Sequence, residues 1–233
     1  MNIKFGKKNY TILGRISGTL TVDTTKVPDD DERGYLIFNG ESWDFLEPST
    51  YKLLKKIDKE EQTIVLVLES PHIDEFDSNH NPIRPANGVT GANIEYFIKR
   101  GYATLWNLSE NVDYRICLVN AVQLQASCIH SLQANNITLN TKYQREVLKH
   151  CVLIHAFDTS DLQIRIDTLQ PNIIINCCTE KSDNMPRIIN NDIYVMVEEA
   201  ILSIPNHQFT LNTNYFRCFH PVSEDWKTVK LKP

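Results

Sequence analysis

The chain of 233 residues lacks any apolar run approaching the roughly 20 residues that a membrane-spanning helix needs. Its N-terminus also lacks the apolar core of a secretory signal peptide. We therefore expect a cytoplasmic protein without a membrane partner. The length is sufficient for one large hydrophobic core, or for one core with a small additional unit.

Two further absences concern cysteine pairs and positive charge. None of the six cysteines forms a C-x-x-C pair, so a zinc ribbon or a cysteine-ligated cluster is not expected and no cofactor is predicted. Several cysteines lie inside apolar runs, where a reduced cysteine packs as a small hydrophobe. The net charge is −5, whereas nucleic-acid binding usually shows as a basic excess. A local basic patch can still dominate the field of a cleft.

Internal repeats and low-complexity segments are absent as well. Residues 1–60 are predicted to form a small β-rich N-terminal extension, because apolar residues alternate with polar ones between Tyr10 and Val22. Asn39-Gly40 lies between two apolar runs, which indicates a hairpin. A short helix is expected near 48–57, and the acidic run Asp29–Glu32 is expected to be a solvated loop.

From residue 61 onward the pattern changes to short, continuous apolar runs separated by helical patterns. The runs are "TIVLVLE" at 63–69, "RICLVNAV" at 115–122, "NIIINCC" at 172–178 and "YFRCFH" at 215–220. Helical spacing is found near 91–100, 142–157, 160–169 and 192–204. This alternation is typical of a parallel sheet covered on both faces. The sequence therefore predicts an α/β domain over 61–233, a three-layer α/β/α fold with a four-stranded parallel sheet.

Polar residues follow each apolar run. Glu69-Ser70-Pro71-His72 comes after the first, Asn120 lies within the second, Thr179 and Glu180 follow the third, and His220-Pro221 follows the fourth. Ligands of such sheets bind at the carboxyl ends of the strands. We therefore expect a carboxylate, an amide and an imidazole to converge in one candidate site.

These segments, in this order, resemble the motifs of the uracil-DNA glycosylase superfamily. "LESPH" resembles the family's first loop, of the type G-E-A-P-G or G-Q-D-P-Y-H, and keeps Glu69 and Pro71. "RPANGVTG", residues 84–91, resembles the R-P-F-V-G-x-A-G loop of the thermostable branch. "CLVN" supplies Asn120, "PNIIINCCTE" approximates the third strand, and "HPV" resembles the H-P-S motif with His220. The likeness covers roughly residues 61–226.

The resemblance implies the family's fold, a DNA partner and hydrolysis of the N-glycosidic bond of a flipped-out base. Such a reaction places positive charge on the sugar and negative charge on the leaving base, so it needs a carboxylate and a hydrogen-bond donor. It implies catalytic roles for Glu69 and His220. Base contacts are expected from Asn120, His72, Ser70 and Ala86. DNA contacts are expected from Pro71, Arg84, Gly88, Gly91, Pro221, Arg217 and Trp226.

The sequence departs from the family at several positions. Ala86 replaces the aromatic residue that stacks on the base, His72 replaces a tyrosine that excludes 5-substituted pyrimidines, and Val222 replaces the serine of H-P-S. The cysteine spacing of the iron–sulfur branch is missing. A larger pocket follows from the first two changes, so the expected substrate is uracil or a bulkier 5-modified pyrimidine, in single- or double-stranded DNA, in repair or in defence against modified phage DNA.

Other readings of the same residues remain open at this stage. Each named side chain also has an ordinary structural explanation: Glu69 as a solvated strand-end acid, His220 and Trp226 as packing residues. Asp74 and Glu75 are reserve candidates for the catalytic carboxylate, although loop acids are usually solvated. His72, Asp74, Glu75 and His80 could instead form a metal site, without the i, i+4 histidine spacing of a helix-borne zinc site. The fold could also serve an inactive nucleic-acid-binding or interaction module, or a nucleoside or nucleotide N-glycosidase. A monomer is expected in each case.

Overall fold

The computed structural model describes residues 2–5, 8–11, 19–22, 28–55, 59–79, 81–100, 106, 108–123, 149–150, 152–179, 192–205, 209–210 and 213–218. Strands β1 (Asn2–Phe5), β2 (Lys8–Thr11) and β3 (Thr19–Val22) form a small sheet of their own, in the order β2-β1-β3. β1 pairs with β2 antiparallel and with β3 parallel. A β-rich beginning of the chain, as the alternation predicted, is therefore present.

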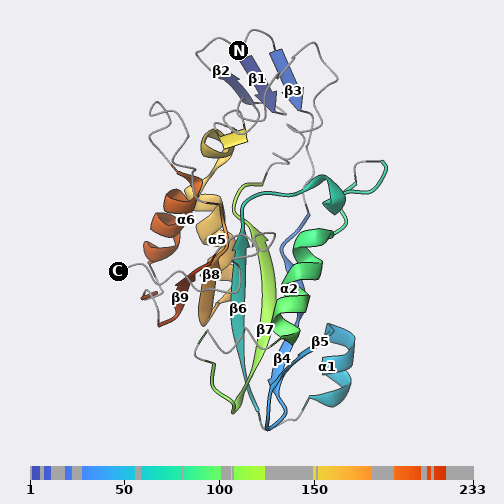
Figure 1. Ribbon diagram of the computed structural model, residues 1–233. Helices are drawn as coiled ribbons and strands as arrows, with labels where there is room; N and C mark the ends of the chain where they lie inside the picture. The colour runs from blue at the N-terminus through green and yellow to red at the C-terminus, as the bar shows by residue number, and fades with distance from the viewer. Residues whose placement is uncertain are drawn as a thin grey trace.

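The main sheet has six strands and is mixed (Figure 1). Its order is β5-β4-β7-β6-β8-β9. The strands are β4 (Asp31–Phe38), β5 (Trp43–Leu46), β6 (Glu60–Leu68), β7 (Val112–Asn120), β8 (Ile173–Asn176) and β9 (Tyr215–Arg217). The last four strands are parallel to one another, whereas β4 runs antiparallel to both β7 and β5.

The prediction of a four-stranded parallel sheet is therefore wrong in strand number and in type. The predicted hairpin at Asn39-Gly40 is confirmed, with Gly40 at a φ of 102°, but this hairpin adds β4 and β5 to the main sheet. A boundary near residue 60 does not separate it from the strands that follow, because β4 pairs with β7 from Asp31↔Leu118 onward. An antiparallel pair at one edge supplies the two extra strands.

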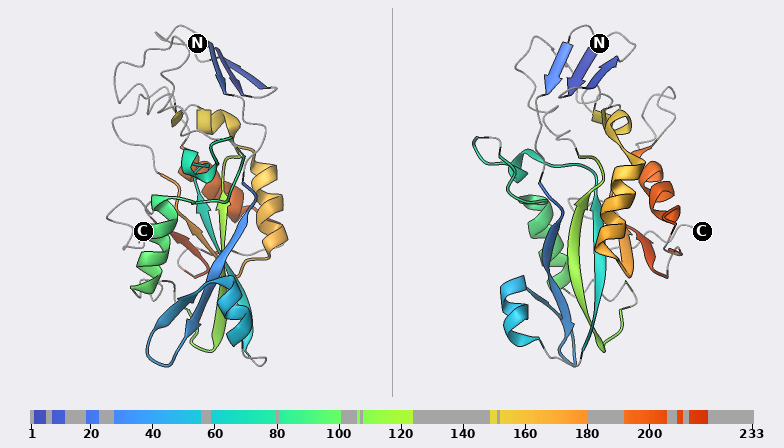
Figure 2. Two further views of the ribbon diagram at one scale, coloured as in Figure 1. Left: turned by 90° about the vertical axis from the view of Figure 1, so that its right-hand side faces the viewer. Right: turned by 180° about the vertical axis from the view of Figure 1, so that it is seen from behind.

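Helices cover both faces of the sheet (Figures 1 and 2). Val65 and Val67 of β6 pack toward α5 (Thr159–Leu169) and α6 (Ile193–Leu202). Side chains from β6 at the alternate positions, such as Leu66, pack on the opposite face against α2 (Val89–Lys99). A strand buried on both faces has no polar side, which is why β6 reads as a continuous apolar run.

Helix positions agree with the spacing of the apolar residues. α2, α5 and α6 lie within two or three residues of the predicted ranges, and α1 spans Pro48–Leu54. α5 and α6 begin at aspartate caps, Asp158 and Asp192, whose side chains accept a backbone N–H at 3.1 Å and 3.0 Å. In the described part of the chain, no helix is long and apolar enough to cross a membrane.

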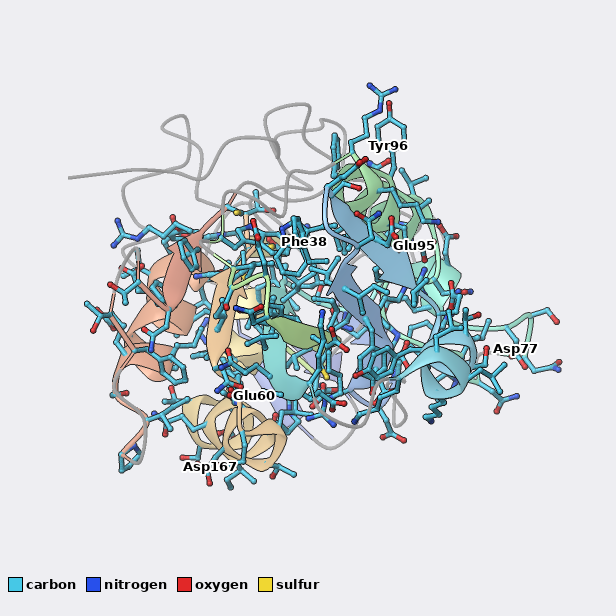
Figure 3. The ribbon with its side chains drawn as sticks, turned by 90° about the horizontal axis from the view of Figure 1, so that it is seen from below. Phe38, Glu60, Asp77, Glu95, Tyr96 and Asp167 are labelled. Carbon is cyan, nitrogen blue, oxygen red and sulfur yellow. The ribbon has the colours of Figure 1, made fainter. Side chains whose placement is uncertain are left out.

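Seen along the strands, the layers separate clearly. Figure 3 shows α2, with Glu95 and Tyr96, on one side of the sheet and α5, with Asp167, on the other. Glu60, at the start of β6, lies at the end that faces the viewer in Figure 3. The carboxyl ends of the parallel strands, and the predicted site with them, are at the opposite end of the sheet.

The acidic run Asp29–Glu32 is not a solvated loop. Asp31 and Glu32 begin β4, and Asp30 accepts a hydrogen bond from Arg165 Nη1 at 2.9 Å. Arg165 also donates to Asp161 one turn earlier in α5, at 2.9 Å. These contacts link the start of β4 to α5 across the carboxyl end of the sheet.

Gly91 permits a close contact between the first turn of α2 and the preceding loop. A Cβ at this position would lie 2.0 Å from the carbonyl oxygen of Ala86, which is backbone and cannot rotate away. We expect Gly91→Ala to lower the free energy of unfolding by about 1–3 kcal/mol, in the range of overpacking substitutions. Urea denaturation measures this directly.

Gly88→Ala is the matched control for that measurement. Its added Cβ would meet the carboxylate of Asp74 at 2.8 Å, the end of a half-exposed side chain that can move. The expected loss of stability is well under half that of Gly91→Ala. Equal losses for the two variants would contradict the steric explanation.

Candidate active site

A cavity of about 330 Å³ opens beside the carboxyl end of β6. Its walls come from the loop after β6, from the turn before α2 and from the helical residue Lys149. In Figure 1 this loop and the helical stretch around 152–156 both lie at the upper end of the sheet, where the parallel strands end. The volume is at the lower end of the range of small-molecule sites, about 300–1,000 Å³.

Glu69 leaves β6 directly into this cavity and is 6% exposed. Backbone pairing continues past the strand, since the Val122 N–H donates to the Glu69 carbonyl at 3.0 Å. Its carboxylate forms an ion pair with Lys149 Nζ. The ammonium group stabilises the charged form of the carboxylate in a site shielded from water. Glu69 is therefore a buried acid paired with a lysine, and not a solvated strand-end acid.

Glu75 is the second buried carboxyl of the cavity and is 3% exposed. It lies in the 3-10 turn η1 (Ile73–Glu75), which folds the chain back over the end of β6. Burial is the largest influence and raises the pKa of Glu75 to about 7; backbone hydrogen bonds from His72 and Ala86 and the Asn120 amide oppose this shift. The prediction that Asp74 and Glu75 are both solvated loop acids holds for Asp74, which is exposed, and is wrong for Glu75.

Asn120 ends β7 beside Leu68, its register partner in β6. Its Nδ2 donates to Glu75 Oε2 at 3.1 Å, while its Oδ1 is buried without a donor among the described residues. Arg165 Nη2 holds the Asn120 carbonyl at 3.0 Å. Asn120 is 1% exposed and acts on the cavity through Glu75, because it is not itself one of the lining residues.

Ala86 adopts a left-handed backbone conformation, with a φ of 51°, and its side chain is buried in the cavity wall. This conformation is unfavourable for a residue with a Cβ, by about 1–2 kcal/mol. It is held there because its backbone bonds to Glu75 and its carbonyl packs against Gly91. Backbone strain of this kind concentrates at functional sites.

The other described residues with predicted roles divide into two groups. Ser70, His72 and Gly88 line the cavity, and Pro71 is buried beside it. His72 is exposed, with Nδ1 3.2 Å from Asp74 Oδ2.

The two arginines with predicted DNA contacts lie outside the cavity wall. Arg84 is exposed and donates to Asn87 Oδ1 at 3.3 Å. Arg217 is engaged with Glu198 of α6 through two hydrogen bonds, at 2.6 Å and 2.5 Å. A phosphate contact by Arg217 would require this ion pair to open.

Some predicted positions lie outside the described residues. They are His220, Pro221 and Trp226, together with Glu180 and the His80 of the alternative metal site. Within the described residues, no group of three or more His, Cys, Asp or Glu side chains is arranged to hold a metal ion. Cys117, Cys177, Cys178 and Cys218 are buried free thiols.

Sequence reasoning missed Lys149, and it named Glu75 as a reserve catalytic candidate without predicting that this residue is buried. Lys149 lies within the predicted helix at 142–157, but nothing in its spacing indicates a partner 80 positions earlier. The sequence holds one weak signal for the burial of Glu75, which is the apolar residue Phe76 that follows it. Phe76 is buried in the structure, so the loop packs back against the core at this point.

Comparisons with known proteins leave the site to be interpreted from its own chemistry. No family model, no curated protein and no solved structure matches the chain.

Replacing Glu75 with glutamine should change how stability depends on pH. Native Glu75 holds its proton up to about pH 7, whereas the ordinary pKa is 4.5, so between these values the native state binds more protons than the unfolded chain. The free energy of unfolding of the wild type therefore falls as the pH rises through this window. Glutamine keeps an acceptor for Asn120 and does not titrate.

The stability of Glu75→Gln relative to the wild type should thus increase by about 3 kcal/mol between pH 4.5 and pH 8. Urea denaturation at both pH values measures the difference. Glu199→Gln, an exposed position on α6, is the matched control and should show no comparable change. A pH-independent difference for Glu75→Gln would contradict the burial argument.

Proposed function

We propose that this chain is a DNA glycosylase, which hydrolyses the N-glycosidic bond of a flipped-out base and leaves an abasic site. The observation that carries the proposal is Glu69, a buried carboxylate that a lysine keeps charged in a cavity at the carboxyl end of the central strand. A negative charge there stabilises the oxocarbenium character of the sugar and can orient the attacking water. The resemblance of "LESPH" and "CLVN" to the glycosylase motifs supports the same assignment.

The uracil-DNA-glycosylase-like fold is part of this proposal. The parallel strands β6, β7, β8 and β9 lie in the order β7-β6-β8-β9, with helices on both faces. This order places the end of β6 next to the end of β7. The proposed glycosylase site requires these two strand ends to be neighbours. The β4–β5 hairpin is then an addition to the edge of that core.

The substrate that we propose is a 5-modified pyrimidine. Ala86 and His72, the residues that stand where the family has larger aromatic groups, both line the cavity. An alanine leaves space where a stacking ring would otherwise lie. A base with a bulky 5-substituent therefore fits better here than in a pocket closed by two aromatic rings.

A second candidate, an N-glycosidase acting on free nucleosides or nucleotides, is favoured by the charges of the cavity. Three carboxyl groups line it, from Glu69, Asp74 and Glu75, against the single ammonium of Lys149. A polyanion is attracted weakly by such a surface. A hydrogen bond from His220 to the departing base would serve both candidates, whereas a DNA contact by Trp226 would serve only the DNA glycosylase.

Glu69→Gln tests the proposal. Oligonucleotides carrying uracil and a panel of 5-substituted pyrimidines, and the matching free nucleosides, are incubated with protein, and released base is measured by chromatography. We expect the wild type to release at least one base, and Glu69→Gln to be about 10²–10³-fold slower because the cation loses its counter-charge. Glu199→Gln is the matched control and should equal the wild type.

The substrate form separates the two candidates. Release from oligonucleotides, with alkali-labile abasic sites, supports the DNA glycosylase; release from nucleosides alone supports the second candidate. If the wild type releases no base from any substrate while remaining folded by circular dichroism, the hydrolytic function is refuted and a binding module is left.

A further inference from the structure

Two of the three carboxyl groups that line the cavity, those of Glu69 and Glu75, are buried, but their surroundings differ in kind. Glu69 faces the ammonium of Lys149, which stabilises a negative charge. Among the described residues, the hydrogen-bond partners of the Glu75 carboxyl group are all neutral: the Asn120 amide and the backbone of His72 and Ala86. Sites that run acid and base chemistry at one pH use two titratable groups whose environments separate their proton affinities.

Among the described residues, the charged group that acts most on Glu75 is Asp74, in the same turn, and its negative charge opposes ionisation of Glu75. Glu69 and Lys149 line the same cavity, where they form an ion pair with each other. His72 is turned toward Asp74 at the exposed rim. Loss of hydration therefore dominates, and a substantial fraction of Glu75 is protonated near neutral pH.

We propose that Glu75 is the general acid of the site, which donates its proton to the departing base, and that the substrate is therefore a 5-substituted cytosine. The inference rests on the proposed glycosylase function and deepens it. A uracil-type base leaves as a delocalised anion and needs only a hydrogen-bond donor. A cytosine-type base forms a much poorer anion, so its departure is assisted by a proton, and a buried acid in the cavity wall supplies one.

The bond between C1′ and the base nitrogen breaks, and its electron pair goes to the base. The Glu75 proton is transferred to an acceptor atom of the base, which leaves neutral, and Glu75 becomes a carboxylate. Water adds to C1′ and gives a proton to the Glu69 carboxylate. Exchange with solvent then returns Glu69 to its ionised form and Glu75 to its acid form.

The side-chain amide of Asn120 can hydrogen-bond to Glu75 in both protonation states of the carboxyl group. In the carboxylate state, Nδ2 donates to Glu75 Oε2, as observed at 3.1 Å. In the acid state, rotation of the amide would turn Oδ1, buried and without a described donor, toward the Glu75 hydroxyl as its acceptor. One amide can thus hold the carboxyl group in place before and after transfer, and Asn120 is a positioning residue rather than a direct reader of the base.

Two oligonucleotides that differ in the acidity of the leaving base test this assignment, one with 5-hydroxymethylcytosine and one with 5-formylcytosine. The formyl group withdraws electrons, so this base leaves more readily without a proton, while the two bases are similar in size. Single-turnover release is measured from pH 5 to pH 9 for the wild type, Glu75→Gln, Glu69→Gln and Glu199→Gln.

We expect Glu75→Gln to slow release of 5-hydroxymethylcytosine by about 10²–10³-fold at pH 7 and release of 5-formylcytosine by less than about 10-fold. The wild-type rate on 5-hydroxymethylcytosine should fall as the pH rises above about 7, and the rate of Glu75→Gln should not. Glu69→Gln should slow both substrates alike, because its role does not depend on the leaving group.

Several outcomes would overturn the proposal. Equal losses on the two bases in Glu75→Gln, with an unchanged pH profile, would make Glu75 a structural acid. A wild-type rate independent of pH between 6 and 9 would exclude proton donation whether or not the variant folds. Release of uracil derivatives but of neither cytosine would refute the inference while leaving the glycosylase function intact. Release of no base from any substrate would refute both.

Discussion

The parallel pairing of β6 with β7 is the constraint on which the other features depend. The two strands stay in register from Glu60↔Val112 to Leu68↔Asn120, and the hydrogen bonds continue beyond the strand end, where Ala121 N–H donates to the Leu68 carbonyl at 2.7 Å. Because both strands are buried on both faces, a slip of one residue would exchange the faces of every apolar side chain. The register is therefore strongly specified, and it delivers Glu69 and Asn120 to the same edge.

At that edge two carboxyl groups are buried, and the loss of hydration is compensated differently for each of them. Glu69 is compensated by an opposite charge from Lys149, whereas Glu75 is surrounded by neutral donors and shifts its proton affinity instead. Both solutions are ordinary physical responses to low dielectric surroundings. Placed in one cavity, a lysine-paired carboxyl group and a carboxyl group with a raised pKa differ in proton affinity, which is the combination that the proposed cleavage of a glycosidic bond would use.

Contacts on both faces of the sheet support the residues around the cavity. Arg165 of α5 donates to the Asn120 carbonyl at the end of β7, to Asp161 and to Asp30, the residue before β4. On the other side of the sheet, Ala86 in the cavity wall adopts a left-handed conformation between Glu75 and Gly91.

Local periodicity and turn chemistry were enough to predict the four parallel strands, the helices between them, the hairpin at Asn39-Gly40 and the position of Glu69 at a strand end. The place where the hairpin joins the sheet, the pairing of Asp30 and the different neighbours of Glu69 and Glu75 could not be predicted in this way. Those outcomes depend on contacts between segments far apart in the chain, such as the 80 positions from Glu69 to Lys149 or the 45 from Glu75 to Asn120. An exposed acid and a buried acid look the same in the sequence, because burial depends on segments that are distant along the chain.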